Sequence, residues 1–202
     1  MTTEKTLEKI YKIKASEAKD HLIDELITEL KADLLKEAAK KNGTAGKKKA
    51  ADNIIKQLKK FGKQGGAITA ADGSQIIGGS YSAVKLIEPL PVEPCSNAHD
   101  LPVYIRFIDN ARSNNGAAVS LPSIAELTAH IKERKAAKDK YIYYDFGEGL
   151  PLVAAQYLLE IITLLPGAVC VTSARDTLIK PLYFKSEAGE GLLLPVRKGT
   201  KK

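Results

Sequence analysis

The sequence predicts an α+β fold, in which helices and antiparallel strands share one apolar core. Apolar residues recur at helical spacing over 18–38, and short apolar segments separated by Asp72-Gly73 and Gly78-Gly79 follow over 67–87. Of the 202 residues, 44% are hydrophobic, which is enough for a globular core. Long helices mixed with hairpin-linked strands are typical of this class.

The N-terminal part is expected to contain a short strand, two helices and a three-stranded meander. The strand is predicted at 11–15, and Ser16 is a suitable N-cap for a long helix that ends near Asn42-Gly43, where glycine tolerates the left-handed conformation. A second helix is predicted over 49–61. Glycines end this helix, and alternation with tight turns then predicts strands at 67–70, 75–77 and 80–87.

The middle of the chain begins with a connector. Residues 88–102 hold four of the nine prolines, which predicts an extended segment. A strand is expected at 103–108. Ser123 and Glu126 have the spacing of a capping box, so a helix should begin there and run to about Lys138.

The C-terminal part repeats the order of the N-terminal part. We expect a strand at 141–146, an aliphatic helix at 152–165, and strands at 168–173, 178–184 and 191–196. One strand, a helix and three strands are likewise predicted over 12–87, so the repeat is one of pattern. The apolar run at 150–165 contains Glu160 and is shorter than the ~20 residues that a membrane span needs, so no membrane association is expected.

Positive charge is concentrated in one stretch. Eleven lysines against three acids give residues 31–63 a formal charge of +8, whereas the whole chain carries +7. In the second helix the lysines repeat at i, i+3, i+4 and i+7, away from the apolar face. This segregation predicts sequence-independent contact with a nucleic-acid backbone through Lys40, Lys41, Lys47, Lys48, Lys49, Lys56, Lys59, Lys60 and Lys63.

The same lysines have a second interpretation, in which they only keep the helix solvated. The chain would then be a structural or protein-interaction module. Its partner would meet the apolar face of the 49–61 helix or the edge of the C-terminal sheet. Association of identical chains is compatible with both interpretations.

No combination of side chains predicts catalysis, so the protein is not expected to be an enzyme. The three histidines are scattered, without a nucleophile or carboxylate at meaningful spacing. Cys95 and His99 could share a metal, but a structural zinc needs four ligands and no second pair is present, so neither a metal nor another cofactor is expected. Only a cleft gathering Asp145, Glu148 and Glu190 would favour an enzyme.

The cellular compartment is predicted from the N-terminus and the cysteines. Residues 1–14 alternate charges with single aliphatic residues, which argues against a signal peptide. A cytoplasmic protein with Cys95 and Cys170 both reduced is therefore expected.

Four segments carry a resemblance to a known family. Residues 155–162 (AQYLLEII), 179–182 (IKPL) and 192–197 (LLLPVR) follow one another as helix, strand and terminal strand, and residues 68–73 (ITAADG) end in an Asp-Gly turn. They resemble a domain of the bacterial DNA polymerase sliding clamps. This resemblance implies a non-enzymatic replication protein whose helices face DNA and whose partners dock near the C-terminal strand, at Leu194, Pro195, Val196 and Arg197.

On this basis the chain is predicted to be a single clamp-like domain of two strand-helix-three-strand repeats with helical insertions. Residues 1–90 would form the first repeat, with a lysine-rich insertion at about 31–63. Residues 91–140 would be a connector with a strand and a helix, and 141–202 the second repeat with a basic tail. Because the 152–165 helix carries only one charge, the basic surface favours contact with nucleic acid from one side rather than a ring threaded on DNA.

Overall fold

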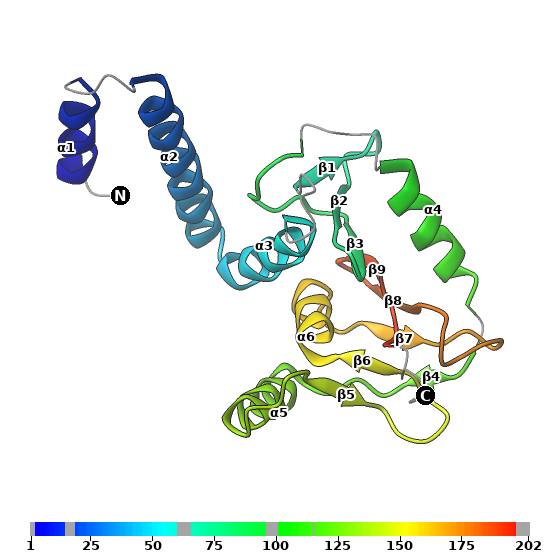
Figure 1. The fold of residues 1–202 in the computed structure, drawn as a ribbon. Helices are drawn as coiled ribbons and strands as arrows, with labels where there is room; N and C mark the ends of the chain where they lie inside the picture. The colour runs from blue at the N-terminus through cyan, green and yellow to red at the C-terminus, as the bar shows by residue number, and fades with distance from the viewer. Residues whose placement is uncertain (1–2, 15–18, 60–65, 96–100, 115, 197–202) are drawn as a thin grey trace.

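The computed structural model describes residues 3–14, 19–59, 66–95, 101–114 and 116–196, and it shows an α+β protein built around a large sheet (Figure 1). Its helices are α1 (Thr3–Lys14), α2 (Lys19–Lys41), α3 (Ala45–Lys59), α4 (Leu101–Arg112), α5 (Ile124–Ala136) and α6 (Ala155–Leu164). Its strands are β1 (Ala67–Thr69), β2 (Gln75–Gly78), β3 (Ser82–Leu86), β4 (Ala118–Val119), β5 (Tyr143–Asp145), β6 (Leu152–Ala154), β7 (Val169–Val171), β8 (Leu182–Ser186) and β9 (Gly189–Leu193). The predicted fold class is confirmed.

Two three-stranded meanders make up most of the sheet. The strand order in this sheet is β1-β2-β3-β9-β8-β7-β4, with antiparallel neighbours throughout, while β5 and β6 pair in a separate two-stranded sheet. The meanders β1–β3 and β7–β9 join where β3 pairs with β9, with Val84 opposite Gly191. Each meander follows a helix, α3 or α6, and these two helices pack against each other. A helix followed by three antiparallel strands therefore occurs twice, and equivalent elements of the two units meet.

The main apolar core lies between the sheet and the pair α3 and α6. Ile54 of α3 and Leu158 and Ile161 of α6 are fully buried, in one cluster with Val84 and Phe184 of the sheet. Burial of such side chains is the main favourable contribution to folding, because it removes apolar area from water. This packing buries one face of α3 and leaves the opposite face of the helix towards solvent.

Helix α4 covers part of the other face of the sheet, where its Ile108 and Ala111 pack with Leu192. A Cβ at Gly78 of β2 would come within 2.2 Å of the Tyr104 ring, so glycine is needed for this close approach. The predicted strand at 103–108 is therefore wrong. Tyr104, Ile108 and Ala111 recur at helical spacing, and one helical face buries them together against the sheet.

Other boundaries also differ from the predictions, for example that of the terminal strand, which spans Gly189–Leu193 rather than 191–196. Residues 11–14 belong to α1 rather than to a strand, because helical periodicity over twelve residues outweighs a short alternation. The aliphatic helix begins only at Ala155, since residues 152–154 pair with β5 as β6. Strand β8 begins at Leu182 rather than at 178. Among the described residues of the first repeat, no strand precedes the helices.

Local signals that act through caps and turns are confirmed. Gly43 follows α2 with φ of 68°, and the Ser123 hydroxyl accepts a hydrogen bond from the Glu126 amide (3.1 Å). The Glu126 carboxylate in turn accepts one from the Ser123 amide (2.8 Å), which completes the capping box of α5. The predicted meander over 67–87 is also present.

Helices α1 and α2 form an arm that extends away from the sheet and its covering helices (Figure 1). The arm joins the rest of the protein where the C-terminal end of α2 meets α3. Within the described part of the chain, no helix is long and apolar enough to cross a bilayer.

Candidate nucleic-acid interface

The predicted phosphate-binding lysines do not all reach the surface. Lys40 and Lys41 at the end of α2 and Lys49 and Lys56 on α3 are exposed, and Lys47 is half-buried. Lys60, Lys63 and the side chain of Lys59 lie outside the described residues.

Lys48 differs from its neighbours because it is only 8% exposed. Its ammonium donates a hydrogen bond to the Asp52 carboxylate at 2.7 Å, one helical turn further along α3. A buried lysine that already has an acidic partner is not available to a phosphate. Lys48 therefore contributes to the packing of α3 and not to a binding surface.

The apolar face of α3 is part of the core. Ile55 and Leu58 are buried, and Ile55 belongs to the same cluster as the side chains of α6. The interpretation in which this face meets a protein partner is therefore wrong. It is occupied by the protein's own core, which leaves the lysine face of the helix to solvent.

A groove lies between α3, α5 and α6, and three lysines line it. Lys49 comes from α3, while Lys132 and Lys135 come from the last turns of α5; all three are exposed. The groove has a volume of about 520 Å³, and apolar residues such as Ile131 and Leu159 also line it. We call this feature the basic groove.

Sequence reasoning missed Lys132 and Lys135. In the sequence they belong to the short segment 132–140, where five basic residues against two acids give +3, a smaller total than the +8 over 31–63. They join Lys49 because α5 packs beside α6, and α6 packs on α3. This local excess, together with the basic residues Arg134 and Lys135 in the last turn of α5, is the signal that could have found them.

The basic groove also contains one carboxylate, that of Glu160 on α6. This side chain is 3% exposed, and it accepts hydrogen bonds from the amides of Gln57 (3.2 Å) and Gln156 (3.4 Å). Because the carboxylate is held beneath the surface, the exposed charges of the groove are the three ammonium groups. Such an arrangement attracts anions.

The predicted partner-binding residues are divided between two cavities. Leu194, which is 37% exposed, lines a cavity of about 780 Å³ beneath α4 together with Tyr104 and Phe107, which we call the α4 cavity. Val196 lines a different cavity, and its amide donates to the Leu152 carbonyl (2.7 Å). Pro195, which lies between Leu194 and Val196 in the sequence, is half-buried. Arg197 is outside the described residues.

One polar group in the wall of the α4 cavity lacks a partner. Ser82 of β3 is 2% exposed, and its hydroxyl makes no hydrogen bond among the described residues. A buried hydroxyl without a partner is costly, so this position is either a local weakness or a point that a ligand can satisfy.

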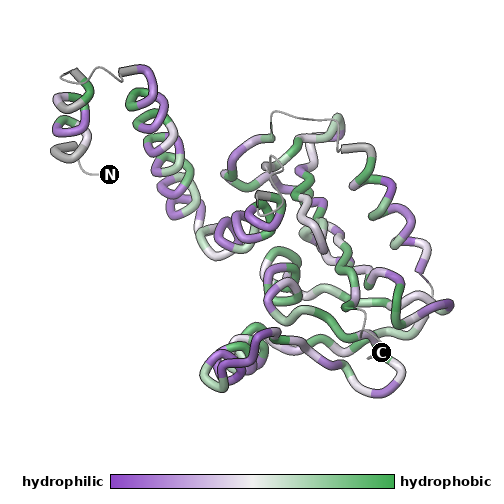
Figure 2. The backbone as a smooth tube through the Cα atoms, in the orientation of Figure 1, coloured by the Kyte–Doolittle hydropathy of each residue, from purple (hydrophilic) through white to green (hydrophobic). Residues whose placement is uncertain are grey.

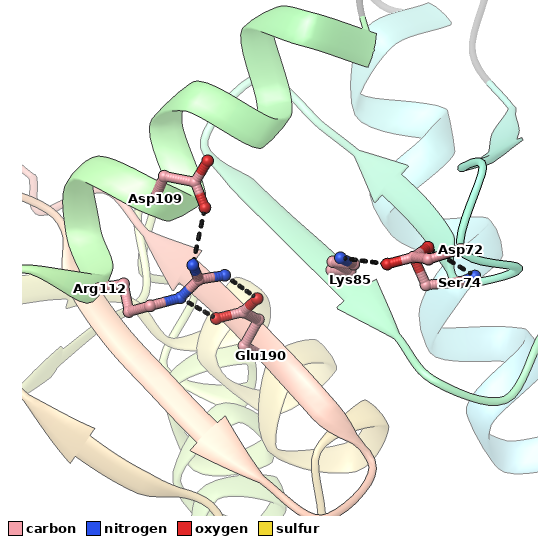
Figure 3. A network of polar contacts seen from close by, with 6 residues as sticks. All are labelled: Asp72, Ser74, Lys85, Asp109, Arg112 and Glu190. Carbon is pink, nitrogen blue, oxygen red and sulfur yellow. Dashed lines mark hydrogen bonds and ion pairs between the residues drawn. The ribbon is translucent and has the colours of Figure 1, made fainter.

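A polar cluster fastens α4 to the sheet (Figure 3). Arg112 donates two hydrogen bonds to the Glu190 carboxylate, from Nε at 3.0 Å and from a terminal nitrogen at 2.5 Å, and also pairs with Asp109 at 3.0 Å. The Tyr183 hydroxyl donates to the same carboxylate at 2.6 Å. Burial acts to raise the pKa of Glu190, but the bonds from Arg112 and Tyr183 outweigh it and lower the pKa.

The same cluster holds a second ion pair, between Lys85 of β3 and Asp72 (2.8 Å). The hydrogen bond from Lys85, and then those from Ser74, hold the pKa of the Asp72 carboxyl well below its usual range. These paired charges link the turn that contains Asp72 to β3. Because they are paired, they do not form a cation-lined site.

The carboxylates whose convergence would favour an enzyme lie apart. Glu190 and Arg112 line one cavity, which is distinct from the α4 cavity. Asp145 and Glu148 line another cavity together with Val196. Among the described residues, no group of three histidine, cysteine or acidic side chains is placed to hold a metal ion. Both cysteines are free thiols, and burial raises the pKa of Cys170 to about 12.

The fold and the groove define a class: an α+β protein with a basic groove between its helices. Comparison of the chain with protein-family models, with curated proteins and with solved structures finds no match. The function therefore has to be inferred from the surface itself.

Proposed function

We propose that the chain is a non-enzymatic, clamp-like protein that binds the backbone of double-stranded nucleic acid through the basic groove and the exposed lysines beside it. The observation that carries this proposal is the convergence of Lys49 from α3 with Lys132 and Lys135 from α5. Lysine ammonium groups contact phosphates as point charges, so they position a duplex without reading its sequence.

The repeated unit of the fold supports the clamp-like part of the proposal. Helices α3 and α6 precede equivalent meanders and lie together on one face of the sheet. In the family that the sequence resembles, helices of this kind face DNA. Here α6 supplies no cation, and α5 supplies the lysines next to it, so the contact is expected from one side of the duplex.

The test is the salt dependence of binding to a fluorescently labelled duplex of mixed sequence, measured by anisotropy. Replacing Lys49, Lys132 and Lys135 together with glutamine should reduce the slope of log K against log salt by about 2.7, at about 0.9 for each lost phosphate contact. Three exposed basic residues elsewhere provide a control that removes the same charge, namely Arg175, Lys180 and Lys185. An equal loss of slope in both triple variants would show that net charge, and not the groove, holds the duplex.

A second candidate function rests on the α4 cavity, in which a protein partner would dock against the C-terminal strand. It is favoured by the exposed Leu194 and Phe107 in its lining and by the unpartnered Ser82 hydroxyl. In this case the lysines only solvate the surface. Replacing Leu194 with aspartate should then abolish capture of the partner, while the groove variant captures it normally. If the groove variant loses the partner and the Leu194→Asp variant still captures it, the α4 cavity is excluded as the docking site.

A further inference from the structure

The arm leaves a stripe of large apolar side chains on its surface. On α2 the exposed residues are Ile23, Ile27, Leu30 and Leu34, with Leu34 64% exposed. Their spacing of four, three and four residues is that of the a and d positions of a heptad, so all four lie on one side of the helix. Helix α1 adds Leu7, Ile10 and Tyr11, which are also exposed. Figure 2 shows hydrophobic and hydrophilic residues interspersed along both helices.

Helix α1 covers a different side of α2. Lys9 of α1 forms an ion pair with Glu29, and Leu22, Leu26 and Glu29 share one side of α2 at intervals of four and three residues. Both leucines are half-buried. The contact with α1 therefore uses this side and leaves the stripe on the adjacent one open.

At its base the arm is anchored rather than loosely attached. Ala39 of α2 is 1% exposed, and the last turns of α2 pack against α3. The arm extends away from the sheet (Figure 1), and of the four stripe residues only Leu34, at the end nearest α3, lines a cavity that Ile55 of α3 also lines. Because exposed apolar stripes at this spacing are costly in water, a partner should cover the stripe.

The charge of α2 identifies that partner. From Lys19 to Leu30 the helix has one lysine against four acids, whereas from Lys31 to Lys41 it has four lysines against two acids. A second α2 that runs antiparallel brings the acidic half of each helix beside the basic half of the other. A parallel copy would instead place like charges together.

The positions of the stripe residues are also symmetric about the midpoint of the stripe. It is centred between residues 28 and 29, so in an antiparallel pair Ile23 lies level with Leu34 of the second copy, and Ile27 with Leu30. Asp24 and Lys31 occupy the same heptad position beside the stripe. In the antiparallel pair, Asp24 of one copy lies within about 3 Å, measured along the helix axis, of Lys31 of the other copy. A two-fold interface needs this kind of self-complementary surface.

We propose that two copies of this chain associate through their arms, with the α2 helices antiparallel about a two-fold axis and the α1 helices completing a four-helix bundle. The proposal is independent of the function suggested for the basic groove. It uses a surface on the arm, outside the groove, so either proposal can fail without the other.

The test is sedimentation equilibrium of the full chain. The wild-type protein should be a dimer, and replacing Ile27 and Leu30 together with glutamate should give a monomer with unchanged circular dichroism. Ile87→Glu is the matched control, because Ile87 is exposed outside the arm and its replacement should leave the dimer intact. A wild-type chain that stays monomeric up to about 1 mM, or a control variant that dissociates equally, would overturn the proposal.

A charge reversal tests the orientation of the helices. Lys31→Glu should weaken the dimer, since it then faces Asp24 of the second copy, and adding Asp24→Lys should restore the association. Failure of the double variant to recover would exclude the antiparallel arrangement. A dimer that forms only when another protein or a lipid vesicle is present would likewise contradict self-association.

Discussion

Lys48 and Lys49 are adjacent in α3, and the structure predicts opposite consequences when each is replaced with glutamine. Lys49 is exposed in the basic groove, whereas Lys48 is buried against Asp52. Both changes remove one positive charge from the same helix. Any effect of net charge alone is therefore identical in the two variants, which makes each the control for the other.

The magnitudes follow from the contacts. Lys48→Gln loses a charge-assisted hydrogen bond of 2.7 Å to a carboxylate whose side chain is 34% exposed, which should lower the free energy of unfolding by about 1–2 kcal/mol. For a chain of this size that corresponds to a fall in Tm of about 2–8 °C. Lys49→Gln should leave Tm unchanged and reduce the salt slope of duplex binding by about 0.9.

Two measurements separate the variants: thermal unfolding followed by circular dichroism, and duplex binding by anisotropy over a range of salt concentrations. The expected result is a stability defect with normal slope for Lys48→Gln and the reverse for Lys49→Gln. If Lys48→Gln lowers the slope as much as Lys49→Gln, then Lys48 reaches phosphate and the assignment of the groove is incorrect.

Three further changes test the fold. Ser82→Ala should leave stability unchanged or raise it by about 1 kcal/mol, because the hydroxyl it removes is buried without a partner, and a clear loss in denaturant titration would show that the hydroxyl is bonded. Leu158→Ala, in the contact between α6 and the core, should cost about 3–5 kcal/mol in the same titration, and a cost under about 1 kcal/mol would mean that this core is loosely packed. Because folding lowers the pKa of Glu190 from 4.5, its contribution to stability is present above about pH 4.5 and is lost as the pH falls through the folded value. The stability difference between the wild type and Glu190→Gln should therefore shrink below pH 4.5, and a difference that is constant with pH would contradict the role given to Arg112.

Local signals in the sequence predicted the elements that depend on neighbouring residues. The long helix that is followed by Gly43, the capping box at Ser123 and the meander over 67–87 are all present. Each depends on contacts within a few residues, through caps, turns and alternation, so the information lies in one short stretch of sequence.

Other elements could not be predicted in this way. The segment 103–108 is rich in β-branched and aromatic residues, which favour a strand locally, yet it lies in α4. The decisive contacts are with Gly78 and Leu192, far away in the chain. Tertiary packing overrides a weak local preference when it buries one face of the alternative element.

By itself the sequence determined that this protein has an α+β fold and that its positive charge is concentrated in residues 31–63. Only the tertiary structure decided which lysines can act together. It buried Lys48 with Asp52 and placed Lys132 and Lys135 beside Lys49 across a groove between three helices. The physical reason is that charge is a property of composition, whereas exposure and proximity depend on which helix faces enter the core.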